Sequence, residues 1–170
     1  MKHLKLFENF IEEDDIPKIF YHNTDKNNLD SILKNGLIIN HNTEGKTTQL
    51  DHVKELYGCM MPIFITSNKN MFKEKNDVIL EINTTDLNVV SDIPSFEDWL
   101  SSIDGIWRKV KDGYKFNSEL APDEIYDVLI NDCLTFNRML TDKDVIKKLI
   151  YITQTAAILE NVSRNRIKIV

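Results

Sequence analysis

The chain has 170 residues, of which 42% are hydrophobic and 28% are charged. This length and composition predict one folded domain with a core that needs no disulfide or metal, and they exclude disorder over the whole chain. The formal net charge of −6 argues against strong non-specific binding of nucleic acid. It leaves room for a local basic groove.

No segment of the sequence is typical of membrane insertion or export. No apolar run approaches the roughly 18 residues of a membrane-spanning helix, and the first residues lack the pattern of a signal peptide. Cys59 and Cys133 are the only cysteines, and we expect them to be buried thiols in a reducing compartment. The sequence therefore predicts a cytoplasmic protein that does not bind membranes.

Apolar residues recur at helical spacing near the N-terminus, and this predicts an amphipathic helix over residues 1–15. An acidic cluster at 12–15 and then Pro17 end it. Residues 5–10 resemble the starts of many small tailed-phage proteins, which would place the protein in the cytoplasm of a bacterial host. The alternative interpretation is an ordinary packing helix.

A strand, a helix and a second strand follow. Residues 19–22 form an apolar run that predicts a short buried strand ending at His22. Asp25 is placed to cap the next helix, which covers residues 29–34. Gly36 is expected as the residue that ends this helix, and residues 37–39 as the second strand.

Many short strands with interspersed helices predict an α+β fold. With no internal repeat or shift in composition, we expect a single domain over 1–170, with a core at 18–130 and a helical C-terminal extension at 131–170. The remaining expected elements are helices over 49–57, around Met71 and Phe72, from about Ser95, and two within 132–160 that divide near Thr141–Asp142, with strands over 63–66, 78–82, 87–90, 116–120, 124–130 and 167–170.

Several familiar site motifs are absent from the sequence. It has no P-loop, no Gly-x-Gly-x-x-Gly, no His-Glu-x-x-His and no Cys-x-x-Cys, and its four histidines lack ligand spacing. We therefore expect no metal site, and we expect His41 and His52 to be solvated. Trp99, Trp107 and Tyr114 are expected to be packing residues.

Polar residues follow three expected strands, at 22–24, 66–68 and 117–119. Residues 21–24 with 29–37 resemble the first motif of the ADP-ribosyltransferase superfamily, in which an aromatic-His-x-Thr strand leads to a helix ending in Gly-Leu. The match is closest to the branch with DarT-type DNA ADP-ribosyltransferases and RNA 2′-phosphotransferases. Residues 64–67 resemble the second motif, and 117–125 resemble the third, which carries the catalytic glutamate.

This resemblance implies a split antiparallel or mixed sheet with surrounding helices, and a mono-ADP-ribosyltransferase. Such an enzyme uses NAD as a co-substrate and modifies a protein or nucleic-acid acceptor. Glu119 would be catalytic, stabilising positive charge on the nicotinamide ribose, and His22 would donate a hydrogen bond to the adenosine-side ribose. The residues implied at the NAD site are Tyr21, His22, Asn23, Thr24, Gly36, Phe64, Thr66, Ser67 and Phe72.

Other interpretations of these residues stay open. His22 could be a core histidine, Thr66 and Ser67 could cap a helix, and Glu119 could be a surface carboxylate beside a turn. A catalytically inactive binding or inhibitor protein of a phage is the first alternative function. RNA 2′-phosphate transfer is the second, and the acidic charge and the presence of only four arginines disfavour it.

Overall fold

The computed structural model describes residues 16–39, 48–58, 61–71, 77–103, 107–116 and 134–170. In chain order the elements are β1 (Ile19–Asp25), η1 (Lys26–Asn28), α2 (Leu29–Asn35), α3 (Thr48–Leu56), β2 (Ile63–Thr66), β3 (Asp77–Asn83), β4 (Val89–Ser91), α4 (Ile93–Ser101), β5 (Trp107–Val110), β6 (Gly113–Phe116), β7 (Leu134–Thr135), α6 (Phe136–Thr141), α7 (Lys143–Thr153), β8 (Thr155–Ile158), η2 (Arg164–Arg166) and β9 (Ile167–Ile169). This content confirms the predicted α+β class.

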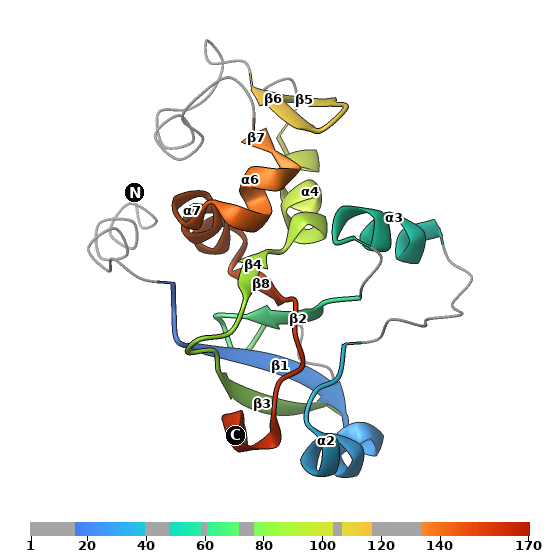
Figure 1. Cartoon of the computed structure of the whole chain (residues 1–170), viewed down its shortest axis with the longest axis vertical. Helices are drawn as coiled ribbons and strands as arrows, with labels where there is room; N and C mark the ends of the chain where they lie inside the picture. Colours follow the sequence, from blue (N-terminus) through green and yellow to red (C-terminus); the bar gives the residue numbers. More distant parts are fainter. Residues whose placement is uncertain (1–15, 40–47, 59–60, 72–76, 104–106, 117–133) are drawn as a thin grey trace.

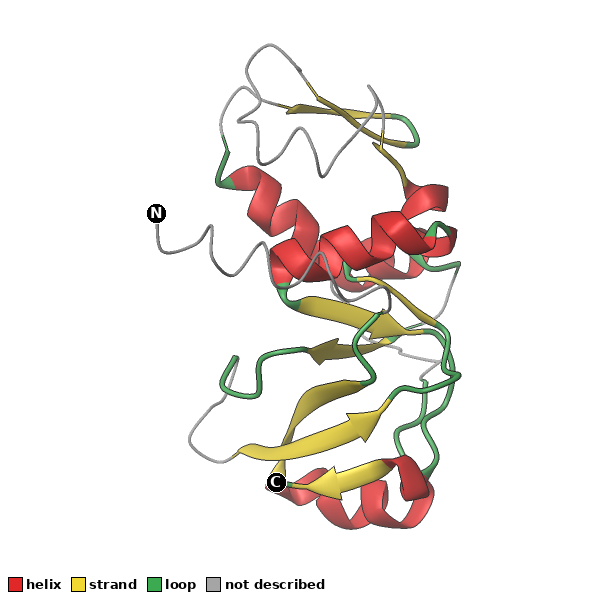
Figure 2. Cartoon of the chain, turned by 90° about the vertical axis from the view of Figure 1, so that its left-hand side faces the viewer, coloured by secondary structure: helices red, strands yellow, loops and turns green. Residues whose placement is uncertain are grey.

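The elements form layers along the long axis of the molecule (Figure 1). The helices α3, α4, α6 and α7 lie between the larger sheet and the small sheet of β5, β6 and β7. The side view shows the same order, with α2 and its neighbouring short helices at the opposite end (Figure 2). The hairpin of β5 and β6 and helix α2 are therefore at opposite ends of the molecule.

The larger sheet has six strands in the order β4-β8-β2-β1-β3-β9, and every pair is antiparallel. Strand β8 comes from the C-terminal part of the chain and lies between β4 and β2. The expectation of a helical extension over 131–170 is therefore wrong in part. This region does contain α6 and α7, but β8 and β9 belong to the main sheet, and β9 confirms the predicted last edge strand.

Two shorter predictions are also wrong. Residues 37–39 are not a strand, because only Leu37 pairs, in an isolated bridge with Val162. The backbone N–H of Ile39 instead bonds to the side chain of Asn161 at 2.8 Å, and Ile38 is 56% exposed. Of the expected helix around Met71 and Phe72, the described part up to Met71 forms a turn, and Phe72 lies outside the described residues. Residues 1–15 and 117–133, for which a helix and strands were expected, also lie outside the described residues.

Helix boundaries follow the capping side chains. Asp142 ends α6 and begins α7, and its carboxylate accepts from the backbone N–H groups of Asp144 and Val145 at 3.2 and 3.3 Å. The other carboxylate oxygen accepts from Arg138, and this bond is the main reason that the pKa of Asp142 is lowered. These contacts confirm the predicted division of the two helices near Thr141–Asp142.

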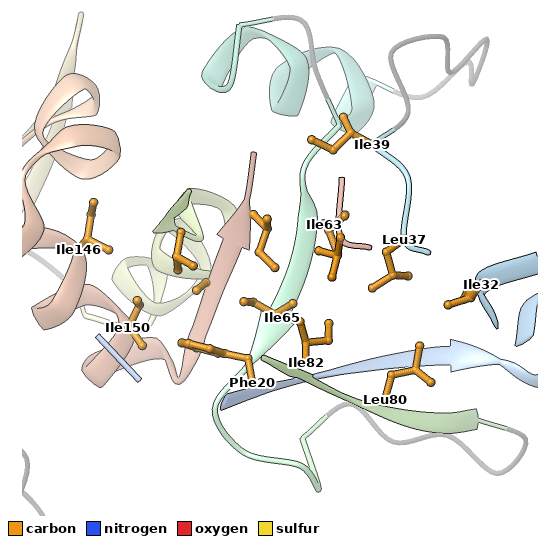
Figure 3. Close-up of a cluster of buried hydrophobic side chains, with 14 residues drawn as sticks. Phe20, Ile32, Leu37, Ile39, Ile63, Ile65, Leu80, Ile82, Ile146 and Ile150 are labelled. Atoms are coloured by element: carbon orange, nitrogen blue, oxygen red, sulfur yellow. The ribbon is translucent and has the colours of Figure 1, made fainter. Parts of the chain in front are cut away.

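Two apolar clusters hold the layers together. The first runs along the larger sheet from α7 to α2 and includes Phe20, Ile65, Leu80 and Ile150 (Figure 3). The second joins β4 and β8 to the helices and the small sheet. Its centre is Tyr114, which is fully buried and whose ring packs 5.5 to 5.7 Å from three other aromatic rings, those of Phe96, Trp107 and Phe136.

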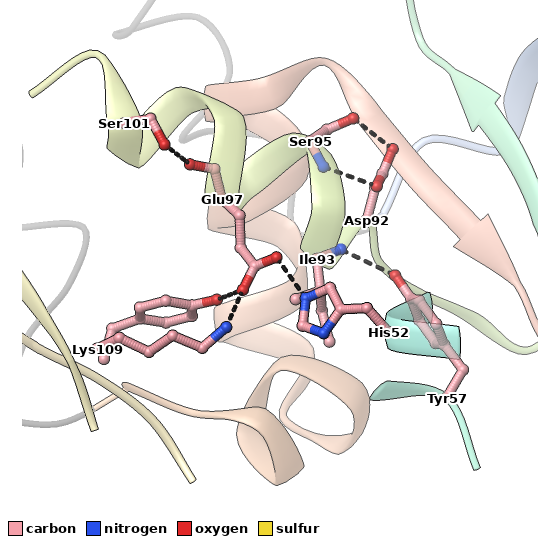
Figure 4. Close-up of polar contacts among 9 residues, drawn as sticks. His52, Tyr57, Asp92, Ile93, Ser95, Glu97, Ser101 and Lys109 are labelled. Carbon is pink, nitrogen blue, oxygen red and sulfur yellow. Dashed lines mark hydrogen bonds and ion pairs between the residues drawn. The ribbon is translucent and has the colours of Figure 1, made fainter. Parts of the chain in front are cut away.

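Glu97 on α4 ties the small sheet to the helices (Figure 4). Its carboxylate accepts from Lys109 at 2.7 Å, from His52 at 2.8 Å, and from the hydroxyl of Tyr114. Burial alone would raise the pKa of Glu97, but the three bonds together outweigh burial and lower it. The expectation that His52 is merely solvated is therefore wrong, because its ring bridges α3 to α4.

Candidate functional site

The candidate site lies where β1 and β2 separate. β1 pairs with β3 through seven residues, but with β2 through only one, Tyr21 opposite Thr66. The expectation that the first strand ends at His22 is wrong, because the long ladder with β3 carries the strand on to Asp25. His22 thus lies inside a strand, next to a partly unpaired edge.

The ring of His22 fills part of this gap. Its Nδ1 lies 2.8 Å from the carbonyl oxygen of Phe64 on β2. A carbonyl can only accept, so Nδ1 must carry the hydrogen. Burial lowers the pKa of His22, and the bond to Phe64 offsets this only in part. His22 is therefore neutral at pH 7, with its single N–H already used and a lone pair on Nε2.

This geometry changes the role expected for His22. The resemblance implied that its N–H donates to a ribose hydroxyl, but the neutral ring has no second N–H to give. Nε2 can only accept a hydrogen bond, so a hydroxyl or amide N–H of a ligand would have to be the donor. No described residue donates to Nε2.

Asn23 adds a second acceptor. Its Nδ2 donates to the carbonyl oxygen of Met71 at 2.8 Å, which fixes the orientation of the amide. Its Oδ1 is buried and has no hydrogen-bond partner among the described residues. Buried acceptors without a partner are rare in folded proteins. Thr24 is buried as well, but it does not line the small pocket that is described below.

The second predicted motif is hydrogen-bonded to Gln154, a residue that the sequence did not point to. The hydroxyl of Thr66 donates to the carbonyl of Gln154 at 2.8 Å, and it accepts from the N–H of Asn68 at 3.1 Å. The same carbonyl accepts from the backbone N–H of Ser67 at 2.9 Å. Gln154 has a left-handed backbone, with φ of 57°, which is a common way for a helix to end, and here it ends α7.

A small pocket brings most of these side chains together. Its volume is about 200 Å³, which is room for one ring or sugar rather than a whole dinucleotide. It unites five predicted residues from two strands, whereas Ser67 and Gly36 lie outside it; Gly36 ends α2 and packs against Val162. The lining residues are Tyr21, His22, Asn23, Phe64, Ile65, Thr66, Met71, Asp92 and Thr155.

In the described part of the lining the acid is Asp92, and its carboxylate already accepts hydrogen bonds within the chain. It caps α4, accepting from the N–H of Ser95 at 3.0 Å and from the hydroxyl of Ser95 at 2.7 Å. Burial raises the pKa of Asp92, and its hydrogen bonds with Ser95 and Thr155 counteract this. Asp92 therefore acts as a structural cap. Glu119, the predicted catalytic residue, and Phe72 lie outside the described residues.

A larger cavity of about 680 Å³ lies elsewhere, between the start of β1, the turn before β4, and helices α6 and α7. It contains none of the predicted site residues. Its charged lining is mixed, with Lys18, Lys143 and Lys147 beside Asp86 and Asp144. It therefore gives no preference for one charge of ligand.

A scan against protein-family models, a search of curated proteins and a search of solved structures found no match to this chain. Among the described residues, no helix is both long enough and apolar enough to span a membrane. Nor do three His, Cys, Asp or Glu side chains of the described part come together as a possible metal site.

Proposed function

We propose that this chain is an NAD-dependent mono-ADP-ribosyltransferase acting on a protein or nucleic-acid acceptor. The observation that carries the proposal is the convergence of two motifs that are far apart in sequence. Tyr21, His22 and Asn23 on β1 line one pocket with Phe64 and Thr66 on β2. The sheet separates at this point, as the split sheet implied by the resemblance would.

The polar groups of the pocket suit the nicotinamide-ribose end of NAD. Nε2 of His22 is an acceptor, and the amide side chain of Asn23 belongs to the same pocket lining. A ribose diol and a carboxamide both offer donors to such groups, whereas a phosphate offers none at pH 7. The pocket volume of about 200 Å³ fits a nicotinamide ring or its ribose, with the rest of NAD outside.

The reaction would transfer the ADP-ribosyl group from nicotinamide to the acceptor. The bond between ribose C1′ and the nicotinamide nitrogen breaks, and nicotinamide leaves with the electron pair. The sugar carbon becomes positively charged in the transition state, and a nucleophile of the acceptor attacks it and loses its proton. The resemblance implies that Glu119 would stabilise this charge. Asp92, the acid in the described lining, is occupied as a helix cap.

The test is incorporation of labelled ADP-ribose from NAD in a cell lysate. We expect the purified wild-type chain to label an acceptor, and Glu119→Ala to lower the rate by about 10² to 10³. Glu124→Ala, which removes a nearby acid, is the matched control and should label normally. Equal labelling by wild type and Glu119→Ala would remove Glu119 from the mechanism.

A second function is supported by the pocket's chemistry: a non-catalytic binder of an NAD-like ligand. The observation that favours it is that the described lining offers no free carboxylate. Calorimetry with NAD separates the two proposals, because a binder gives heat without release of nicotinamide. No heat and no turnover would contradict both. The described lining also contains no arginine, so it adds no support for RNA 2′-phosphate transfer.

A further inference from the structure

The hairpin of β5 and β6 has one apolar face and one basic face. Trp107, Tyr114 and Phe116 pack in the second apolar cluster. Because alternate residues of a strand point to opposite sides, Arg108 and Lys115 point away from this cluster. Both are exposed, and the register places them directly opposite each other.

The turn of the hairpin carries one further exposed cation, Lys111, next to the exposed Asp112. Lys109 is different, because its ammonium group is bound to Glu97 on the other face. We call Arg108, Lys111 and Lys115 the basic face.

The placement of Arg108 opposite Lys115 lowers the stability of the fold. Like charges directly opposite each other destabilise an antiparallel strand pair. Within the described residues, neither Arg108 nor Lys115 forms an ion pair that would relieve this repulsion. An anion from another molecule would relieve it.

The chemistry of the face points to phosphate on a duplex. Arginine binds phosphate through two parallel N–H bonds, and lysine binds it as a point charge. Proteins that bind single strands also need aromatic rings on which bases stack. The three aromatic rings of the hairpin, those of Trp107, Tyr114 and Phe116, are all packed in the second apolar cluster.

We propose that the basic face binds the phosphate backbone of double-stranded nucleic acid. This binding does not depend on the transferase activity proposed above. DNA and RNA duplexes share the phosphate chemistry, and the test has an arm for each.

The test is fluorescence anisotropy of the full chain with a labelled 20-base-pair DNA duplex, and with an RNA duplex of the same sequence, without NAD. Three phosphate contacts predict a slope of log affinity against log salt of about −2.7, or a loss of about 40-fold between 50 and 200 mM salt. The double variant Arg108→Ala with Lys115→Ala should make this slope shallower, at about −0.9.

The matched control removes two lysines at the other end of the molecule. Lys26→Ala with Lys34→Ala changes the net charge equally, and both residues are exposed near α2 (Figure 1). It should bind like wild type. Equal weakening by this control would overturn the proposal, as would the absence of binding to either duplex at 50 mM salt. Displacement of the duplex by polyglutamate at equal charge would overturn it in favour of an acidic protein partner.

A further variant separates binding from folding. Arg108→Glu places opposite charges across the strand pair with Lys115, so it should leave the melting temperature unchanged or raise it. The same variant should weaken duplex binding about as much as the double alanine variant does, because the new glutamate offsets the charge of Lys115. If it binds the duplex as wild type does, the basic face is only a solvated surface and the proposal is wrong.

Discussion

Replacing Glu97 by alanine should destabilise the fold by about 2–4 kcal/mol. The hydroxyl of Tyr114 would lose its acceptor while its side chain stays fully buried, which costs about 1–3 kcal/mol. Lys109 and His52 are partly exposed, so each of their ion pairs adds only about 0.2–1 kcal/mol. For a chain of this size the melting temperature should fall by about 4–16 °C.

The assay is urea denaturation at pH 7, in a double-mutant cycle with Tyr114→Phe. Because the two side chains share one hydrogen bond, we expect their effects to be non-additive by about 0.5–3 kcal/mol. Asp98→Ala, at an exposed neighbouring position on α4, is the control and should stay within about 0.5 kcal/mol of wild type. A Glu97→Ala protein as stable as this control, or strictly additive effects, would refute the reasoning.

Three other predictions concern the sheet and its pocket. Because burial lowers the pKa of His22 below 6.5, the folded chain binds fewer protons than the unfolded chain, so stability should fall as pH drops below 6.5. His22→Asn should remove that part of the pH dependence in urea melts, and nitrogen-15 NMR of the wild type should show the hydrogen on Nδ1. Gly36→Ala should cost at least about 2 kcal/mol in thermal melts, because φ is +80° and the new Cβ would lie 2.2 Å from the carbonyl oxygen of Val162; an unchanged melt contradicts this. Thr66→Val should cost about 1 kcal/mol in urea by removing the bond to Gln154, and Thr66→Ser should restore most of it; equal loss in both would place the effect in packing.

The strands with distinct ends were the predictable ones. β2 follows Pro62, and β3 starts at Asp77, and both are rich in β-branched residues, so pattern alone found them. β8 gave no such signal. All four of its residues are buried, so there is no alternation to detect, and two of them are alanine. It is also separated from α7 only by Gln154, whose left-handed backbone no sequence rule predicts.

The pattern of residues alone predicted the site only within each strand. The adjacent residues Tyr21, His22 and Asn23 were found together because they are neighbours in sequence. The family resemblance grouped Phe64, 42 residues from His22, with them, but neither pattern nor resemblance pointed to Gln154, which is 88 residues from Thr66. The direction of the His22 hydrogen bond depends on a carbonyl of another strand, so the sequence could not show that the single N–H of this ring is already used.

The position of β8 also governs the order in which the protein can fold during synthesis. β2 and β4 are made early, but the strand that joins them is residues 155–158. Until the ribosome has released that segment, the facing edges of β2 and β4 have unpaired N–H and C=O groups, which are templates for pairing with other chains. Such long-range pairing is slow. A pause in translation before residue 155, or a truncation there, should therefore produce aggregates rather than a smaller folded protein.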